Sequence, residues 1–207
     1  KGTYMLDLSP KRKSLFEILC ENIKTANAKY DIVIPWYIMT SVENDIATKA
    51  FFEKNDFFGY PKNSIVFFTQ DKLPIIDIYG KVILQEPYLI KEASNGNGNV
   101  FLAMKKHGIV DIMEQQGIKW IFFGGVDNVL LKNVDPFFIG LTVAKGEEIS
   151  SKSIFKKDPL DKVAVYCRKL GKPSILYYEN IDLKISEMKN LDGQYLYRDA
   201  NILAHLM

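Results

Sequence analysis

Short runs rich in β-branched and aromatic residues alternate with amphipathic helical patterns over the first two thirds of the chain, and this alternation constrains the fold most. Residues 14–28 carry apolar side chains at helical spacing, whereas residues 30–37 (YDIVIPWY) are too few for a helix and predict a buried strand. Thr40 and Glu43 have the spacing of a capping box ahead of a second helix, and a second strand is predicted at residues 64–69. Such alternation favours an α/β fold with a mostly parallel, doubly wound sheet.

The rest of the chain predicts further helices and strands, with antiparallel additions toward the end. The expected elements are a hairpin about Tyr79-Gly80, helices at 96–106, 110–116 and 135–144, and strands at 120–124, 153–157, 163–168 and 174–178. The last two of these strands are joined by a turn at Gly171. The apolar residues 202–207 predict the interior of one more element, with His205 in a helix.

Composition excludes several classes of protein. The 207 residues carry 27 Lys+Arg against 25 Asp+Glu, and a net charge of +2 disfavours nucleic acid as a partner. No apolar run approaches the roughly 18 residues of a membrane span, so a membrane partner is not expected. Cys20 and Cys167 lie far apart in apolar contexts, which predicts reduced thiols and a cytoplasmic protein. Because the chain begins at Lys1 rather than Met, it is expected to be a piece of a longer protein.

Polar residues follow the predicted strands, where an open parallel sheet binds its ligands. They are Thr40 and Ser41, Gln70 and Asp71, the Gly-rich segment 96–99, and Asp127 with Asn128. A carboxylate after an apolar strand suits Mg²⁺, which prefers oxygen ligands. Each feature also has a plainer interpretation: Thr40 and Ser41 as helix caps, Gln70 as an ordinary loop residue, the Gly-rich segment as a turn, and Asp127 as a turn former. Four lysines could neutralise phosphate or simply be solvated: Lys1, Lys152, Lys156 and Lys157.

A series of short motifs runs along the chain: Lys1-Gly2-Thr3-Tyr4, Lys13-Ser14-Leu15-Phe16, Pro35-Trp36-Tyr37-Ile38-Met39-Thr40-Ser41, Phe51-Phe52, Phe67-Phe68-x-Gln70, Leu73-Pro74, Gly80-Lys81, Gly96-Asn97-Gly98, Val126-Asp127-Asn128, Asp135-Pro136-Phe137-Phe138-Ile139-Gly140 and Asn201-Ile202. In these motifs the chain resembles the eukaryotic-type UDP-sugar pyrophosphorylase (uridylyltransferase) family, and its closest branch is that of UDP-N-acetylglucosamine pyrophosphorylase. The motifs occur in the family's order along essentially the whole chain, which makes chance agreement implausible.

The resemblance implies a Rossmann-like, mostly parallel sheet of the nucleotide-diphosphosugar-transferase type, present here in part. Residues 1–207 would be the central catalytic nucleotidyltransferase domain, truncated at both ends. The implied reaction is attack of a sugar 1-phosphate oxygen on the α-phosphorus of UTP, which gives a UDP-sugar and pyrophosphate. Mg²⁺ and lysines would screen the charge of the two anionic substrates. Among the possible sugar substrates, the resemblance favours N-acetylglucosamine 1-phosphate.

The same resemblance implies roles for individual residues. On the nucleotide it places Met39, Thr40, Ser41, Gln70 and Gly96, with Gln70 and Gly96 at uracil. On the sugar it places Asn97, Tyr177 and Asn201. Lys1 and Asp127 are the implied catalytic positions, and Asp127 is also the implied magnesium ligand.

The chain departs from the family at positions that bear on the sugar and the base. Tyr177 stands where the family has a Glu that contacts sugar hydroxyls, Ala164 where it has a Gly near the sugar, and Asp71 where it has a Gly after Gln70. These departures favour an alternative, a non-catalytic UTP or UDP-sugar binding module. A dinucleotide oxidoreductase is disfavoured because the chain lacks a Gly-x-Gly-x-x-Gly turn after a strand.

Overall fold

The structure is a computed structural model that describes residues 1–8 and 10–207. The chain divides into two compact units, Lys1–Lys119 and Trp120–Met207. In the first unit the helices and strands are β1 (Met5–Leu8), β2 (Lys11–Ser14), α1 (Leu15–Tyr30), β3 (Trp36–Thr40), α2 (Asp45–Lys54), β4 (Ile65–Thr69), β5 (Lys72–Pro74), β6 (Leu84–Glu86), β7 (Leu89–Ile90), β8 (Glu92–Ser94), α3 (Val100–Lys106) and α4 (Ile109–Gln115). In the second they are β9 (Phe122–Gly124), α5 (Pro136–Lys145), β10 (Ser150–Phe155), β11 (Val165–Lys169), β12 (Lys172–Leu176), α6 (Leu183–Ser186) and β13 (Asp199–Leu206).

Helix α1 begins where the sequence predicts it. The Ser14 hydroxyl accepts from the Glu17 N–H at 3.1 Å, and the Glu17 carboxylate accepts from the Ser14 N–H, so the two residues form a capping box. The helix extends to Tyr30, and the strand predicted at 30–37 therefore starts only at Trp36. The intervening segment is held as a turn, because the Asn27 side-chain oxygen accepts from the Ile34 N–H at 3.1 Å.

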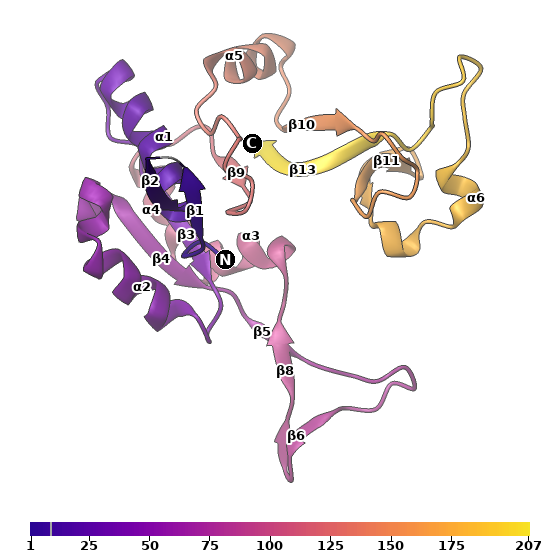
Figure 1. Cartoon of the computed structure of the whole chain (residues 1–207), viewed down its shortest axis with the longest axis horizontal. Helices are drawn as coiled ribbons and strands as arrows, with labels where there is room; N and C mark the ends of the chain where they lie inside the picture. The colour runs from indigo at the N-terminus through magenta and orange to yellow at the C-terminus, as the bar shows by residue number, and fades with distance from the viewer. Residues whose placement is uncertain (9) are drawn as a thin grey trace. The chain divides into compact units, whose positions relative to one another are not determined.

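Strands β3 and β4 pair in parallel, with Trp36 opposite Ile65 and Thr40 opposite Thr69 (Figure 1). An aromatic cluster covers this pair, and its centre is Phe52 of α2, which is fully buried. The Phe52 ring lies edge-on to its neighbours, with centroid distances of 4.9 Å to Phe16 and 5.1 Å to Phe67. Burial of these large rings fixes the helices on the strand pair and so fixes where the two strands end.

The predicted capping box of Thr40 and Glu43 is wrong. Thr40 is the buried last residue of β3, and its hydroxyl lies 2.7 Å from the Asp45 carboxylate and 3.2 Å from the Phe68 carbonyl. Helix α2 instead follows Asn44, and Glu43 forms an ion pair with Lys72 of β5. The local spacing was misleading because tertiary neighbours supply better partners for both side chains.

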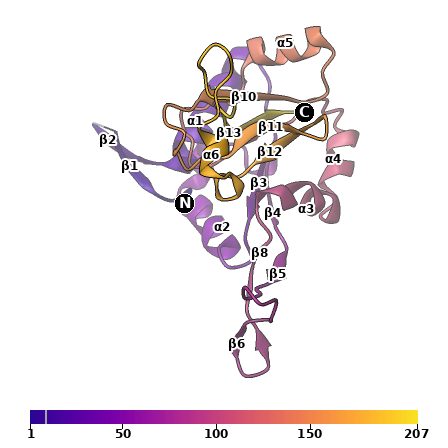
Figure 2. The same ribbon diagram turned by 90° about the vertical axis from the view of Figure 1, so that its right-hand side faces the viewer.

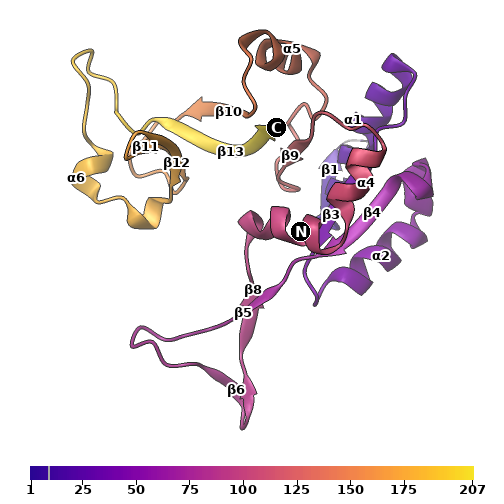
Figure 3. The same cartoon turned by 180° about the vertical axis from the view of Figure 1, so that it is seen from behind.

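The predicted turn at Tyr79-Gly80 is confirmed, since Gly80 has a φ of 80° and Ile76 bridges Val82 across it. The flanking segments are longer and less regular than a single hairpin, because β5 pairs with β8 and β6 pairs with β7. The strands β5 to β8, residues 72–94, form an arm that extends away from the β3–β4 pair in Figure 2. In Figure 3, α3 and α4 of the first unit are at the front.

The second unit is built on a five-stranded sheet with the order β10-β13-β11-β12 and with β9 also paired to β13. All of its strand pairs are antiparallel. The Gly171 turn between β11 and β12 is confirmed, and Leu170 and Gly171 both have positive φ, as a two-residue hairpin requires. The predicted helix around His205 is wrong: the segment is strand β13, in which Ala204 and Leu206 are buried on alternate positions.

The chain therefore has a mixed α/β fold, but a mostly parallel sheet is not confirmed. Within residues 1–8 and 10–207, β3–β4 is the one parallel pair. The pairs β1–β2, β5–β8, β6–β7 and β11–β12 are antiparallel, and so are the pairs that β13 makes with β9, β10 and β11. None of the helices in the described part of the chain is long and apolar enough to cross a membrane.

Candidate functional site

The residues predicted on the nucleotide gather at the carboxyl ends of β3 and β4. The Gln70 N–H donates to the Thr40 carbonyl at 2.9 Å, and the Gln70 side-chain oxygen accepts from the Gly96 N–H at 3.1 Å. Met39 precedes Thr40 on β3, and Ser41 follows it with its N–H bonded to the Asn44 side chain at 2.9 Å. Three segments distant in sequence are thereby joined at one edge of the strand pair.

The partners of Gln70 determine the orientation of its amide. A backbone N–H can only donate, so the atom facing Gly96 is the oxygen, Oε1. The NH₂ group of Gln70 is then the part of the amide that is left to donate elsewhere. An amide donor that is half-buried beside a Gly-rich segment is suited to a carbonyl oxygen of a nucleotide base.

The Gly-rich segment 96–99 is anchored by the buried side chain of Asn99, a role that the sequence does not predict. Asn99 is 4% exposed, and its side-chain oxygen accepts from the Asp71 N–H at 3.1 Å. The Asn95 N–H donates to the Asp71 carbonyl at 3.0 Å, and the Asp71 carboxylate pairs with Lys106 of α3. Asp71, one of the departures from the family, thus anchors the loop. An Asn within an Asn-Gly run carries no local signal for such a role.

Two further predicted residues lie in this unit. Asn97 is exposed in the single turn Asn97–Asn99 that precedes α3, beside Gly96, whose φ is 88°. Lys1 is exposed, and its carbonyl accepts from the Tyr4 N–H at 2.8 Å.

An ion pair ties the loop after β3 to the start of β5. The hydrogen bond from Lys72 lowers the pKa of Glu43 from its ordinary value of 4.5 to about 2. The Glu43 carboxylate therefore stays charged at any physiological pH, and the pair supports the segment that contains Gln70.

Asp127 follows β9 of the second unit in a Gly-rich turn. The Gly125 N–H donates to the Leu203 carbonyl at 3.3 Å, and the Asn128 N–H closes the turn on the Gly125 carbonyl at 3.2 Å. A Cβ at Gly125 would come within 3.0 Å of the Asp127 Oδ1 and within 3.2 Å of the Leu203 side chain. The absence of a side chain at Gly125 leaves room beside its backbone for both the Asp127 carboxylate and the Leu203 side chain.

Asn201 holds a kink in β13 beside that turn. Its Oδ1 accepts from the Leu203 N–H at 2.8 Å and from the Tyr166 hydroxyl at 3.0 Å, and Leu203 has a φ of 53°. A non-glycine residue rarely adopts this conformation, so the side-chain bond to its N–H stabilises the kink. Leu203 thus bonds both to Asn201, through its N–H, and to Gly125 of the turn that carries Asp127, through its carbonyl.

The other sugar-side positions lie in the same row of the sheet. The Asn201 N–H donates to the Ala164 carbonyl at 2.8 Å, and Val165 pairs with Leu176, which brings Ala164 level with Tyr177. Tyr177 is 58% exposed. The structure therefore groups Asn201 of β13 with Ala164, which directly precedes β11, and Tyr177, which directly follows β12.

A divalent cation at the turn after β9 would find the carboxylate of Asp127. Among the residues that the structure describes, no group of three or more His, Cys, Asp or Glu side chains could hold a metal. Mg²⁺ is commonly held by one or two carboxylates together with substrate phosphates and water. The exposed Asp127 carboxylate fits that mode of binding.

Two of the lysines considered for phosphate are engaged within the unit. Lys152 donates to the Asp135 carboxylate at 2.6 Å and lies 5.0 Å from the Phe138 ring centroid. This hydrogen bond lowers the pKa of Asp135. Lys156 is 8% exposed and donates to the Pro159 carbonyl at 2.9 Å.

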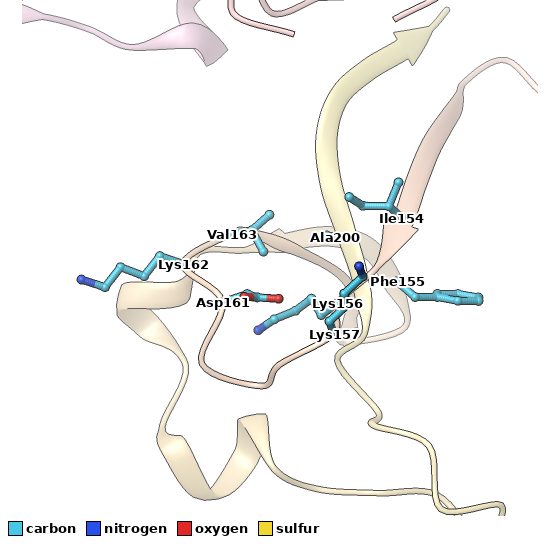
Figure 4. Close-up of a pocket in the computed structure, with 8 residues that line it drawn as sticks. All are labelled: Ile154, Phe155, Lys156, Lys157, Asp161, Lys162, Val163 and Ala200. Carbon is cyan, nitrogen blue, oxygen red and sulfur yellow. The ribbon is translucent and has the colours of Figure 1, made fainter. Parts of the chain in front are cut away.

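Lys156 also lines a cavity of about 410 Å³ between β10, the start of β13 and the loop that leads to Ala164. Figure 4 shows Lys162 pointing outward from this loop, whereas Lys156 lies inside it. The buried ammonium of Lys156 therefore shapes the loop and is not offered to a ligand.

The chain is similar to a known family of enzymes and to individual members of it. Residues 3–207 match the family described as UTP--glucose-1-phosphate uridylyltransferase. The chain is 36% identical over 209 residues to UDP-N-acetylglucosamine pyrophosphorylase of Saccharomyces cerevisiae, covering 99% of this chain and 44% of that protein. It is 34% identical over 211 residues to UDP-N-acetylhexosamine pyrophosphorylase-like protein 1 of Mus musculus, covering 99% of this chain and 41% of that protein.

A solved structure is also similar over the whole chain. The crystal structure of the uridine diphosphate N-acetylglucosamine pyrophosphorylase from Trypanosoma brucei in complex with inhibitor matches with a TM-score of 0.86 at 30% identity, covering 100% of this chain and 43% of that chain. The chain thus spans less than half the length of the relatives that it matches.

Proposed function

The chain belongs to the UTP--glucose-1-phosphate uridylyltransferase family, and from this we propose that the complete protein makes a UDP-sugar and pyrophosphate from UTP and a sugar 1-phosphate. N-acetylglucosamine 1-phosphate is the proposed sugar substrate, since the yeast relative is named for that sugar. The observation that carries the proposal is the hydrogen-bonded joining of Thr40, Gln70 and Gly96, the positions that the family resemblance assigns to the nucleotide.

In the proposed reaction an oxygen of the sugar 1-phosphate attacks the α-phosphorus of UTP. The bond from that phosphorus to the oxygen that bridges it to the β-phosphorus breaks, and pyrophosphate leaves. The protein needs no nucleophile of its own, because holding two anionic reactants in line supplies most of the rate. We assign the uracil to Gln70 and Gly96, whose amide donor and open backbone suit a base edge, and the nucleotide side to Met39, Thr40 and Ser41.

The sugar is assigned to the row of the second unit that contains Asn201, Ala164 and Tyr177. Asn97 of the first unit is assigned to the sugar on the family resemblance alone. The row supports this assignment because it presents an amide, a small side chain and an exposed phenol at one end of the sheet. Tyr177 offers a hydroxyl and a ring face where the family has a carboxylate, so sugar hydroxyls would be recognised by a neutral group.

We assign Mg²⁺ to Asp127, whose exposed carboxylate would hold the ion beside the substrate phosphates. When bound there, the cation would screen phosphate charge during transfer. Asp127 lies in the turn that is closed by the Asn128 N–H on the Gly125 carbonyl and joined to β13 by the Gly125 N–H. Lys1 is assigned to the phosphates as well, on the family resemblance.

Three broader features belong to the same proposal. Both units would form one central catalytic domain, since the family match runs through them without interruption. The parallel pair β3–β4 would belong to a larger Rossmann-like sheet in the complete protein. A cytoplasmic location is supported by two free thiols, Cys20 and Cys167.

The experiment is pyrophosphate release by the complete protein with UTP and Mg²⁺, offered N-acetylglucosamine 1-phosphate, N-acetylgalactosamine 1-phosphate and glucose 1-phosphate in turn. Fastest release with N-acetylglucosamine 1-phosphate is expected. Release with another of the three would keep the reaction and change the sugar. No release with any of them, while UTP still raises the melting temperature, would instead favour the non-catalytic binding module.

A further inference from the structure

The amide of Asn201 is oriented by two donors from its own unit. The Leu203 N–H lies 2.8 Å from Oδ1 and can only donate, so this atom is the oxygen. The Tyr166 hydroxyl reaches the same oxygen at 3.0 Å. An amide oxygen has two lone pairs, and both are used here. The NH₂ group is what Asn201 has left to offer.

Tyr166 is committed to this contact by its surroundings. Burial raises the pKa of the Tyr166 hydroxyl, so it keeps its proton at neutral pH. That one proton goes to Asn201. The Tyr166 hydroxyl has two other polar neighbours, His205, whose Nδ1 lies at 3.5 Å, and Ser151. They can only donate to the Tyr166 oxygen or bond each other. Ser151 and His205 do lie within 2.8 Å of each other.

His205 also holds the Tyr166 ring. The two rings meet edge-on, with centroids 6.3 Å apart. Burial lowers the pKa of His205, so it is neutral at pH 7 and places no charge beside the phenol. The ring of Tyr166 is thus fixed by packing, and its hydroxyl by hydrogen bonds, independently of any ligand.

We propose that Tyr166 is a positioning residue that locks Asn201 as a hydrogen-bond donor toward an acceptor oxygen of the sugar 1-phosphate. This inference rests on the proposed function, which assigns Asn201 to the sugar. A free asparagine amide can present either its oxygen or its NH₂ group. With Tyr166 and the Leu203 N–H both on Oδ1, Asn201 can select a carbonyl, hydroxyl or phosphate oxygen and reject a ligand that offers only a donor.

The test uses the complete protein and two conservative substitutions. Tyr166→Phe keeps the ring against His205 and removes only the hydroxyl. It is expected to raise KM for the sugar 1-phosphate roughly three- to tenfold, the effect of one neutral hydrogen bond, with KM for UTP unchanged. Asn201→Asp keeps an acceptor for both internal donors but replaces the NH₂ group by an oxygen, so it should weaken sugar binding further. Tyr195→Phe, whose ring lies beside Lys189, is the matched control.

The decisive measurement is Tyr166→Phe in the Asn201→Asp background. If Tyr166 acts through the donor of Asn201, its loss has no further effect on KM once that donor is gone. An equal rise in KM in both backgrounds would overturn the proposal, because a general structural role moves both.

Failure of the proposed function can be told apart from failure of this inference. If the wild-type protein releases no pyrophosphate, the binding of UDP-N-acetylglucosamine measured by calorimetry replaces KM. Weaker binding by Tyr166→Phe then supports the positioning role. Equal binding by the two proteins, or none by either, refutes it.

Discussion

Replacing Gln70 by alanine tests whether the joined loops of the first unit bind uracil. The substitution removes two things at once: the acceptor for the Gly96 N–H at 3.1 Å and the NH₂ group that this bond leaves pointing elsewhere. Only the loss of the NH₂ group bears on which base is bound. The ratio of kcat/KM for UTP to that for CTP should therefore fall by the worth of one neutral hydrogen bond, about 2- to 12-fold.

The activity with UTP should fall further than this ratio. Loss of the Gly96 contact loosens the Gly-rich segment, and two neutral hydrogen bonds that add together are worth about 5- to 150-fold in kcat/KM. Gln70→Glu separates the two effects, because a carboxylate still accepts from the Gly96 N–H but presents an oxygen in place of the donor. Gln70→Glu should lose at least as much preference for UTP as Gln70→Ala.

The assay is the initial rate of pyrophosphate release by the complete protein with UTP or CTP at saturating sugar 1-phosphate. Gln116→Ala is the control, since this exposed glutamine makes one long contact, at 3.4 Å, with the Tyr37 hydroxyl. A UTP-to-CTP ratio unchanged by Gln70→Ala would refute the assignment of Gln70 to the base, even if overall activity fell.

Asp127→Asn should remove most of the turnover and weaken the dependence on Mg²⁺, and unchanged kinetics in a magnesium titration would exclude Asp127 from the reaction. Phe52→Ala should lower the free energy of unfolding by about 3–5 kcal/mol in urea denaturation, because this fully buried ring packs with its centroid 4.9 Å from that of Phe16. A loss below about 1 kcal/mol would contradict the central place of Phe52 in the core. Glu43→Gln removes a carboxylate whose pKa is lowered to about 2 by Lys72. The wild type should therefore exceed the variant in free energy of unfolding by the full amount above about pH 5, and this difference should vanish as the pH falls toward about 2. A difference that stays constant over that range would mean that the ion pair contributes nothing.

The sequence by itself determined the features that depend on near neighbours. Helix α1 and its cap follow from Ser14, Glu17 and the apolar spacing, and the turn at Gly171 follows from a glycine, which adopts positive φ without a steric cost. The order of most helices and strands was predictable for the same reason. Helical bonds and tight turns join residues only a few positions apart, so their signals survive in a linear pattern.

The sequence also identified candidate site residues, through the order of motifs along the chain and not through any single one. What it could not predict was their partners. Asp71, a departure from the family pattern, proved to anchor the Gly-rich segment through Asn99. Thr40 and Glu43 matched a capping box and serve other contacts, because their partners are a backbone carbonyl of β4 and side chains of α2 and β5.

Only the tertiary structure decided the direction of strand pairing and the setting of Asn201. Strand β13 pairs with β9, β10 and β11, and no local pattern in an apolar terminal segment distinguishes this from a helix. The kink at Leu203 and the contact from Tyr166, 35 positions away from Asn201, exist only once those strands lie side by side. A hydrogen bond that sets the direction of an amide depends on distances in space, and these arise from the packing of strands that are remote in sequence.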